Sequence, residues 1–440
     1  MPRPAILPVR PAHFVALALL YAAPHLAWAQ SPAPTPSSGT GVTANDGDVP
    51  GLKACLARLR PDAVKNGVSL ADFDKYTANA RLLQSTVSSA KGQPEGRETW
   101  WDYIAKTVDA ERVSQGKEIQ AQYASELNRV SQQYRVDGEA LVAIFGIETN
   151  YGKQIGRTNV LDAWLTRGCT ESNPLWKKNV YASIRLISEG VVDPATFVGS
   201  WSGAFGMTQF IPTSFYELAA DGDGDGKIDL YNSMPDALAS TANHLLKRRA
   251  KWTHSMPAVV EVKVPAALTS AIPDSPEAET TLANDRRPVS AWAQAGVTNV
   301  DGAPLVRANE GLEGSTSAYL FAPTGARGPI FLATPNFDAI LHYNQSKKYG
   351  LAVSLLVEQL RGHPGIQTPW PTDDPGLSRA EIRQVQTLLN AKGYDVGVPD
   401  GIPGARTRDA VRQEQGAAGM PENGRVGRKI YDWLRAQSQS

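Results

Sequence analysis

Apolar residues recur at three- and four-residue spacing from about Leu52 to about Trp252, with short Gly or Asn breaks between the periodic stretches. This spacing places apolar side chains on one face of a helix, so it predicts a series of α-helices. Residues 30–49 precede them and are rich in Ser, Thr, Pro, Gly and Asp, with almost no large apolar side chain. That composition predicts a disordered leader, and we expect the folded chain to begin near residue 50.

The pattern changes between about residues 256 and 335. Val259 to Val264 reads VVEVKV, which is typical of a strand, and turn-forming sequences such as Asp301-Gly302 recur. Helical spacing returns from Phe337 to Gly362. We therefore predict one mainly α domain at residues 50–363, interrupted by a small β-containing insertion at about 256–335.

The C-terminal part of the chain has an organisation of its own. Residues 364–375 are rich in proline and predict a linker. Ser378 and Glu381 then form a capping-box sequence, and Gly393 is placed to end the helix that follows. Two further helical stretches predict a three-helix domain at residues 376–437.

The first residues predict an export signal. Arg3 and Arg10 precede an apolar stretch from Phe14 to Leu20, and Ala27-Trp28-Ala29 supplies small residues around a cleavage site. This apolar stretch is short for a membrane span, and no later stretch approaches about twenty apolar residues. We expect a signal peptide at residues 1–29, no transmembrane segment after its removal and no lipid-attachment cysteine, with an uncleaved anchor as the alternative.

The sequence contains two cysteines, Cys55 and Cys169. An even count in an exported chain favours a disulfide. The alternative is two buried, unpaired cysteines, because sequence separation does not show whether their Cα atoms come close enough to be bridged.

Composition and charge narrow the classes of protein. The chain has 440 residues with 42% hydrophobic content, which is enough for two or three domains with a sizeable core. Lys+Arg and Asp+Glu balance at 44 each, so no global field attracts nucleic acid or an anionic membrane.

Glu148 is the strongest candidate for a catalytic residue. It follows the run Ala140 to Ile147, which is apolar on nearly every helical face and predicts a buried helix with Asp137 as its N-cap. Burial and the negative end of the helix dipole both disfavour a charged carboxylate there, so we predict a raised pKa and a general acid. The alternative is an ordinary polar residue where a helix surfaces, or one half of a salt bridge.

An acidic loop predicts a calcium site. The sequence from Asp221 to Asp229 reads DGDGDGKID, which matches the first nine positions of an EF-hand-type loop. Position twelve is Asn232 where a bidentate Glu is usual, and Asp236 could complete the shell from a longer loop. The alternative is a solvated acidic turn. The predicted ligands are Asp221, Asp223, Asp225, the main-chain carbonyl of Lys227, and Asp236.

Two further segments combine aromatic and polar groups. Gly199 to Phe210 reads GSWSGAFGMTQF, a mixture that suits a sugar-binding cleft but equally suits tight helix packing. Tyr343 to Tyr349 reads YNQSKKY ahead of a helix and by itself would be interpreted as an N-terminal cap.

Together these motifs resemble the lytic murein transglycosylases of the B type. The resemblance rests on Gly146 to Gly152 (GIETNYG), the Gly199 to Phe210 segment, the Asp-rich loop and Tyr343-Asn344, in that order and spacing, and it covers about Leu52 to Gly362. It implies a lysozyme-like, mostly α-helical fold that cleaves the β-1,4 bond between N-acetylmuramic acid and N-acetylglucosamine and leaves 1,6-anhydromuramic acid ends.

The resemblance also implies roles for single residues. Glu148 corresponds to the only acid/base, Ser200 and Asn344 to groups that position the muramoyl residue, and Gln209 to a cleft ligand. The corresponding cleft aromatics are Tyr103, Phe210, Tyr343 and Tyr349. His244 departs from the family pattern, in which a tyrosine is expected at this position. No cofactor is required for the chemistry, and calcium would be structural.

The tail resembles the three-helix peptidoglycan-binding domain of many wall enzymes, on sequences that include Gly393-Tyr394-Asp395 and Asp400-Gly401-Ile402. Such a domain raises the local concentration of enzyme on the wall; a protein-docking module is the alternative. We expect a periplasmic monomer whose partners are peptidoglycan glycan strands, with other wall enzymes as further candidates. A lysozyme-type muramidase and a non-catalytic wall-binding scaffold are the alternative functions.

Overall fold

The computed structural model describes residues 50–438, apart from 92–97, 248–250, 274, 276–278 and 308–310. The predicted signal peptide at 1–29 and the predicted leader at 30–49 lie outside these described residues. Within them, no helix is long and apolar enough to cross a membrane.

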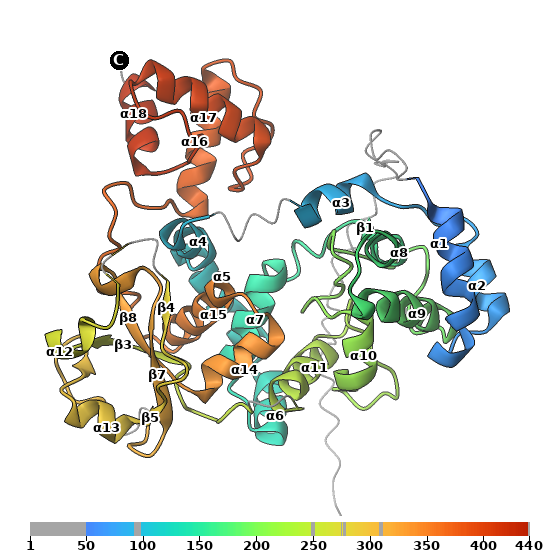
Figure 1. Ribbon diagram of the computed structural model, residues 1–440, viewed down its shortest axis with the longest axis horizontal. Helices are drawn as coiled ribbons and strands as arrows, with labels where there is room; N and C mark the ends of the chain where they lie inside the picture. The colour runs from blue at the N-terminus through green and yellow to red at the C-terminus, as the bar shows by residue number, and fades with distance from the viewer. Residues whose placement is uncertain are drawn as a thin grey trace, which may run out of the picture. The chain divides into compact units, whose positions relative to one another are not determined.

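Helices dominate the first two hundred described residues, as the spacing predicts (Figure 1). They are α1 (Leu52–Leu59), α2 (Leu70–Thr77), α3 (Gln84–Lys91), α4 (Trp100–Thr107), α5 (Ala110–Gln122), α6 (Ala124–Tyr134), α7 (Gly138–Thr149), α8 (Val160–Thr170), α9 (Pro174–Ser188), α10 (Pro212–Leu218) and α11 (Met234–Lys247). Short 3-10 turns at Arg60–Asp62 and Val64–Asn66 follow α1.

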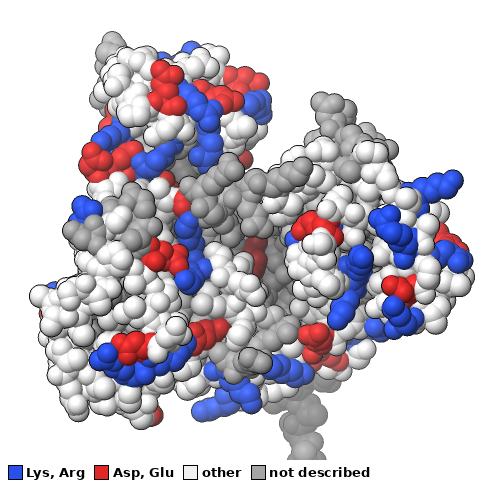
Figure 2. Space-filling view, viewed as in Figure 1, with Lys and Arg blue, Asp and Glu red and all other residues white. Residues whose placement is uncertain are grey.

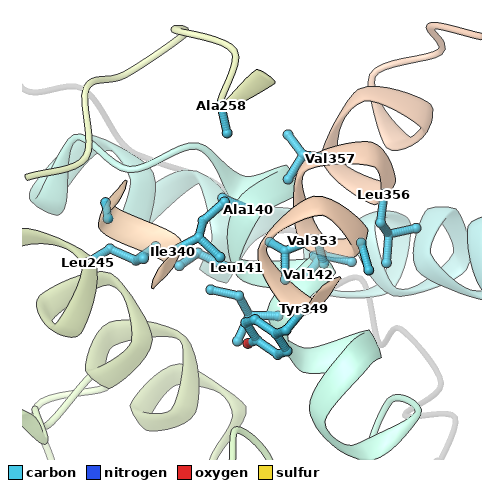
Figure 3. Close-up of a cluster of buried hydrophobic side chains, with 14 of the residues drawn as sticks. Ala140, Leu141, Val142, Leu245, Ala258, Ile340, Tyr349, Val353, Leu356 and Val357 are labelled. Atoms are coloured by element: carbon cyan, nitrogen blue, oxygen red, sulfur yellow. The ribbon is translucent and has the colours of Figure 1, made fainter. Parts of the chain in front are cut away.

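Helix α7 is the centre of the largest core. Its residues from Ala140 to Gly146 are all buried, because α5, α6, α11 and α15 (Lys347–Leu360) surround it. Figure 3 shows side chains of this core, including Leu141 of α7, Leu245 of α11, Ile340 of α14 (Pro335–Tyr343) and Val353 of α15. Buried apolar area on every side of α7 fixes its position, and with it the position of Glu148 near its end.

Asp137 occupies the N-cap position of α7, as predicted, but its carboxylate does not cap the helix. It accepts hydrogen bonds from Trp252 Nε1 at 2.6 Å and from the Ser255 backbone N–H at 3.0 Å. Arg361 lies 3.3 Å from the same carboxylate. The side chain therefore joins α7 to distant segments, which helix-cap preferences alone do not reveal.

A six-stranded antiparallel sheet lies within the predicted β-containing insertion. Its strands are β3 (Val259–Lys263), β4 (Thr280–Thr281), β5 (Arg287–Pro288), β6 (Thr298–Asn299), β7 (Ser317–Ala322) and β8 (Ile330–Ala333), in the order β4-β7-β8-β3-β6 with β5 also paired to β7. Leu320 pairs with Leu332, and Phe321 pairs with Phe331. The insertion also carries α12 (Ala266–Thr269), a 3-10 turn at Gly325–Arg327 and α13 (Val289–Gln294).

Both faces of this sheet are buried. Because side chains alternate along a strand, Leu320 and Leu332 join a core of the insertion around Trp292, whereas Phe321 and Phe331 join the core around α7. The insertion therefore shares a core with the helices on either side of it in sequence.

A second, two-stranded ribbon was not predicted. Here β1 (Thr158–Asn159) pairs with β2 (Val198–Gly199), Thr158 opposite Gly199. Strands of two residues leave no alternation for a sequence pattern to reveal. The ribbon fixes the start of the Gly199 to Phe210 segment.

Helical structure after the insertion is divided between α14 and α15, because Asn344 ends the first helix and Ser346 caps the second. Asn344 Oδ1 accepts a hydrogen bond from the Ser346 backbone at 3.0 Å. Tyr343 is thus the last residue of a helix, and the N-cap function expected for this segment belongs to Ser346.

The tail contains three helices, α16 (Arg379–Ala391), α17 (Ala405–Ala417) and α18 (Arg428–Ser438). The predicted capping box of Ser378 and Glu381 is present, and Gly393 adopts the left-handed conformation just beyond α16. A separate core around Val385, Val411 and Ile430 holds the three helices together.

Cys55 of α1 and Cys169 of α8 form a disulfide, with 5.7 Å between their Cα atoms. The predicted disulfide is therefore confirmed. Figure 2 shows acidic and basic side chains interspersed over the face drawn there, in keeping with the balanced charge of the sequence.

Candidate active site

Glu148 lies one residue before the end of α7 and is half-buried. The chain then turns sharply, because Asn150 and Tyr151 both adopt left-handed conformations, with φ of 50° and 57°. Such angles are unusual for a bulky residue such as tyrosine. Tertiary contacts must therefore hold this turn.

Tyr151 supplies those contacts. Its ring packs edge-on against Phe145 at 5.7 Å between centroids, and its hydroxyl donates to the Arg112 carbonyl oxygen at 2.9 Å. A Cβ atom on Gly146 would lie 2.6 Å from the Tyr151 ring, so glycine is required there for the ring to fit. Gly146 thus belongs to the predicted motif because it makes room for the turn after Glu148.

Tyrosines surround Glu148. Burial and the nearby Glu148 carboxylate raise the pKa of Tyr343, and the same two causes raise the pKa of Tyr349. Tyr103 of α4 is 8% exposed and also contributes to the raised pKa of Tyr349. The structure therefore brings together one catalytic candidate and three of the predicted aromatics, from α4, α7, α14 and α15.

Phe210 lies behind this group. It is 2% exposed, and its ring packs against His244 at 5.8 Å and Tyr343 at 6.2 Å between centroids. The imidazole of His244 lies 4.4 Å from the Tyr343 ring. Phe210, which the sequence suggested as a cleft aromatic, thus contacts the Tyr343 ring beside Glu148.

The three predicted polar contacts make mainly local hydrogen bonds. The Ser200 hydroxyl lies 3.0 Å from that of Ser202, and the Asn344 oxygen accepts from the next turn, as described above. The Gln209 amide donates to the Ile155 carbonyl at 3.2 Å and to the Gly206 carbonyl at 3.0 Å. These bonds fix the backbone of the segments that flank Glu148.

Two residues outside the predicted set, Thr149 and Arg112, also hold the segments around Glu148. Thr149 donates its hydroxyl to the Met207 carbonyl at 2.7 Å, and Tyr343 donates to the next carbonyl, Thr208, at 2.6 Å. Arg112 of α5 donates to the Gly146 carbonyl. Thr149 lies inside the GIETNYG motif, whereas nothing in the pattern around Arg112 indicates its contact.

The acidic loop brings three carboxylates together. Oxygen atoms of Asp221, Asp223 and Asp236 lie within 4.8 Å of one another, and Asp236 is 2% exposed. Asp225 is outside this group, and its carboxylate accepts from the Lys227 backbone at 2.8 Å. Oxygen-only donors of this kind suit Ca²⁺.

A cavity of about 600 Å³ lies elsewhere, between the insertion, the linker and the start of α7. Three of the carboxylates that line it make other contacts: Asp137 as described, Glu358 with Arg361, and Glu261 with the backbone of Gln367 and Thr368. The predicted site residues do not line it.

Residues 51–358 match the transglycosylase SLT domain family. The structure of SltB3 from Pseudomonas aeruginosa, solved in complex with NAG-anhNAM-pentapeptide, matches with a TM-score of 0.66 and 36% identity, over 88% of this chain and 100% of that one. The chain belongs to the B-type lytic transglycosylases. As a lytic transglycosylase it is an enzyme that acts on peptidoglycan, with the lysozyme-like fold that the motifs imply.

This B-type lytic transglycosylase is similar to two Escherichia coli proteins. Membrane-bound lytic murein transglycosylase B of strain K12 is 28% identical over 288 residues, 64% of this chain and 74% of that protein. Slt35, solved in complex with calcium, matches with a TM-score of 0.57 and 26% identity over 70% of this chain and 92% of that one. The tail of the transglycosylase, residues 378–434, matches a peptidoglycan-binding domain family.

Proposed function

We propose that this enzyme cleaves the β-1,4 bond between N-acetylmuramic acid and N-acetylglucosamine with Glu148 as its single acid/base, and that it leaves 1,6-anhydromuramic acid ends. One observation carries the proposal. Glu148 is half-buried at the end of a fully packed helix, and its carboxylate is close enough to Tyr343 and Tyr349 to raise the pKa of both. A carboxyl in such surroundings suits proton transfer.

The reaction begins with protonated Glu148, which gives its proton to the glycosidic oxygen as the bond to C1 of the muramoyl residue breaks. Positive charge develops at C1, and the carbonyl oxygen of the substrate's own N-acetyl group stabilises it. Ionised Glu148 then takes the proton of the C6 hydroxyl, whose oxygen attacks C1 and closes the anhydro ring. Glu148 ends the cycle protonated, so a second carboxylate is not required.

The aromatic and polar residues around Glu148 have supporting roles in this proposal. Tyr103, Tyr343 and Tyr349 form the wall around the carboxyl, and Phe210 supports Tyr343 from the core. Ser200, Gln209 and Asn344 hold the backbone of the flanking segments and present polar groups to the muramoyl residue.

The acidic loop would hold a structural Ca²⁺. Asp221, Asp223 and Asp236 supply carboxylate oxygens already grouped in space, and a cation would offset the repulsion between them. The related Slt35 structure contains calcium, which supports this assignment. The ion takes no part in the proton transfers above.

The periplasm is the compartment that we propose, on the basis of the export signal in the sequence and the disulfide of Cys55 and Cys169. Residues 50–363 would bind and cleave the glycan strand, and residues 376–437 would bind the wall.

Mass spectrometry of muropeptides released from purified sacculi tests the reaction, with Glu148→Gln as the control. We expect anhydromuropeptides from the wild type and a loss of about 10²- to 10⁴-fold in rate in the variant, the usual contribution of general acid–base catalysis. Reducing muramic acid as the sole product would make the enzyme a muramidase instead. If the folded wild type released no product, a non-catalytic wall-binding scaffold would be the remaining interpretation.

A further inference from the structure

Arg379, the first residue of α16 in the tail, reaches into the catalytic domain. Its guanidinium donates to both carboxylate oxygens of Asp109, each at 2.8 Å, and its remaining nitrogen donates to Asn150 Oδ1 at 2.7 Å. The side chains are 10% and 3% exposed for Arg379 and Asp109. A fixed guanidinium fork thus joins a wall-binding helix to the residue that follows Glu148-Thr149.

Asp109 connects the same guanidinium to the turn by a second route. It is the N-cap of α5 and accepts from the Arg112 backbone at 2.8 Å. Arg112 in turn donates to the Gly146 carbonyl and accepts from the Tyr151 hydroxyl. Hydrogen bonds therefore lead from Arg379 to both ends of the Gly146 to Tyr151 segment that contains Glu148.

The electrostatics show that this connection is charged and desolvated. Although burial opposes ionisation, the hydrogen bonds from Arg379 keep the pKa of Asp109 below its ordinary value. Burial and the positive charge of Arg379 lower the pKa of Arg112 to about 10, so both guanidinium groups remain charged at neutral pH. Asp109 is the carboxylate that balances them.

We propose that Arg379 is a positioning residue for Glu148, so that the wall-binding domain affects the rate of bond cleavage as well as attachment to the wall. Asn150 is held in a left-handed conformation immediately after the catalytic segment, and Arg379 fixes its side chain. Loss of this contact releases one side of the turn and lets the Glu148 carboxyl move relative to Tyr343 and Tyr349. The inference rests on the role of Glu148 proposed above.

The matched control is a neighbouring ion pair. Arg383 lies one turn further along α16 and bonds to Glu111 of the catalytic domain at 2.7 Å, but both side chains are about one third exposed. This pair crosses between the same two parts of the chain, and its partners are not Asp109 or Asn150, the residues through which Arg379 reaches the Gly146 to Tyr151 segment. Its removal tests whether any contact between the two parts matters, or only the one made by Arg379.

The experiment compares full-length wild type, Arg379→Ala, Asn150→Gly and Arg383→Ala on short, soluble, uncrosslinked glycan strands, for which attachment to the wall is irrelevant. Asn150→Gly keeps the left-handed backbone and the pair of Arg379 with Asp109, and removes only the contact to the turn. We expect kcat to fall about tenfold or more in Arg379→Ala, because small displacements of reacting groups are costly, with KM within about twofold. The kcat of Asn150→Gly should also fall, and the kcat of Arg383→Ala should equal that of the wild type.

Each other outcome has a definite meaning. Unchanged kcat in a folded Arg379→Ala or Asn150→Gly overturns the proposal, as does an equal loss in Arg383→Ala. If Arg379→Ala does not fold, Asn150→Gly decides. Binding to sacculi is measured in parallel. If Arg379→Ala weakens only this binding and leaves kcat unchanged, the proposal is also overturned. A wild type without product, or an active Glu148→Gln, refutes the proposed function and is recognised separately.

Discussion

The Thr149 hydroxyl donates to the Met207 carbonyl at 2.7 Å, which joins the last residue of α7 to the Gly199 to Phe210 segment. The neighbouring carbonyl, Thr208, accepts from Tyr343. Two consecutive carbonyls of this segment thus accept hydrogen bonds, one from a residue of α7 and the next from a residue of α14. Three motifs that are far apart in sequence meet through these two hydrogen bonds.

Replacement of Tyr343 by Phe should weaken the contact between α14 and the Gly199 to Phe210 segment. The Thr208 carbonyl would lose its donor. We expect the free energy of unfolding in urea to fall by about 1 kcal/mol, and muropeptides to be released from sacculi more slowly. Tyr319→Phe is the matched control, because Tyr319 is also buried and its hydroxyl lies 3.2 Å from Asp338 in the insertion. A similar loss of activity in both variants would contradict the prediction.

Acid should destabilise the contact between Asp109 and Arg379. The folded-state pKa of Asp109 lies below its unfolded value of about 4, so its contribution is complete above that pH and is lost as the pH falls through the folded value. We expect the melting temperature of the wild type to fall more steeply than that of Asp109→Asn from about pH 5 to about pH 3.

At neutral pH the same variant should be less stable than the wild type by about 3 kcal/mol, because Arg379 would remain buried without its counter-charge. Parallel melting curves over the acid range would show that another carboxylate is responsible.

Calcium should stabilise the acidic loop. Addition of the ion at about a hundred times its Kd should raise the free energy of unfolding by about 2.7 kcal/mol, and chelation should reverse this. Asp236→Asn should remove most of the calcium-dependent increase in melting temperature, because Asp236 belongs to the three-carboxylate group. Asp225→Asn should remove less of it, since its carboxylate lies outside that group. An equal effect of both substitutions would show that the ion rearranges the loop.

Loss of the disulfide should be costly. Cys55 and Cys169 are 114 residues apart, and a crosslink of that length restricts the unfolded chain by about 4–5 kcal/mol in the loop-entropy model. Urea unfolding of the double variant Cys55→Ser/Cys169→Ser measures the difference directly. Reduction of the wild type should give the same midpoint, and a wild type insensitive to reductant would argue against the crosslink as a source of stability.

Local patterns in the sequence predicted the elements whose signals are local. The apolar run before Glu148 predicted α7, and Ser378 with Glu381 predicted the start of α16, because helical spacing and capping depend on neighbours three or four residues away. The family motifs indicated Glu148, Tyr343 and Tyr349, which the structure brings together.

Contacts between distant segments could not be predicted from local sequence patterns. Arg379 and Asp109 are 270 residues apart, and neither lies in a pattern that names its partner. The repeated Asp-Gly pairs could not show that Asp225 lies outside the group formed by Asp221, Asp223 and Asp236. Likewise, an aromatic residue in a glycine-rich segment suits a cleft or a core, and only packing shows that Phe210 is buried.

Gly376 limits how such enzymes can exchange domains. A Cβ atom at this position would lie 2.5 Å from the Trp101 carbonyl oxygen, so the chain enters the tail in direct backbone contact with α4. A C-terminal domain transferred from another wall enzyme would keep these contacts with the catalytic domain only if it brought glycine at position 376 and arginine at position 379. Recombination of the two parts should therefore succeed when Gly376 and Arg379 are both kept, and a junction that lacks either would join domains that no longer fit.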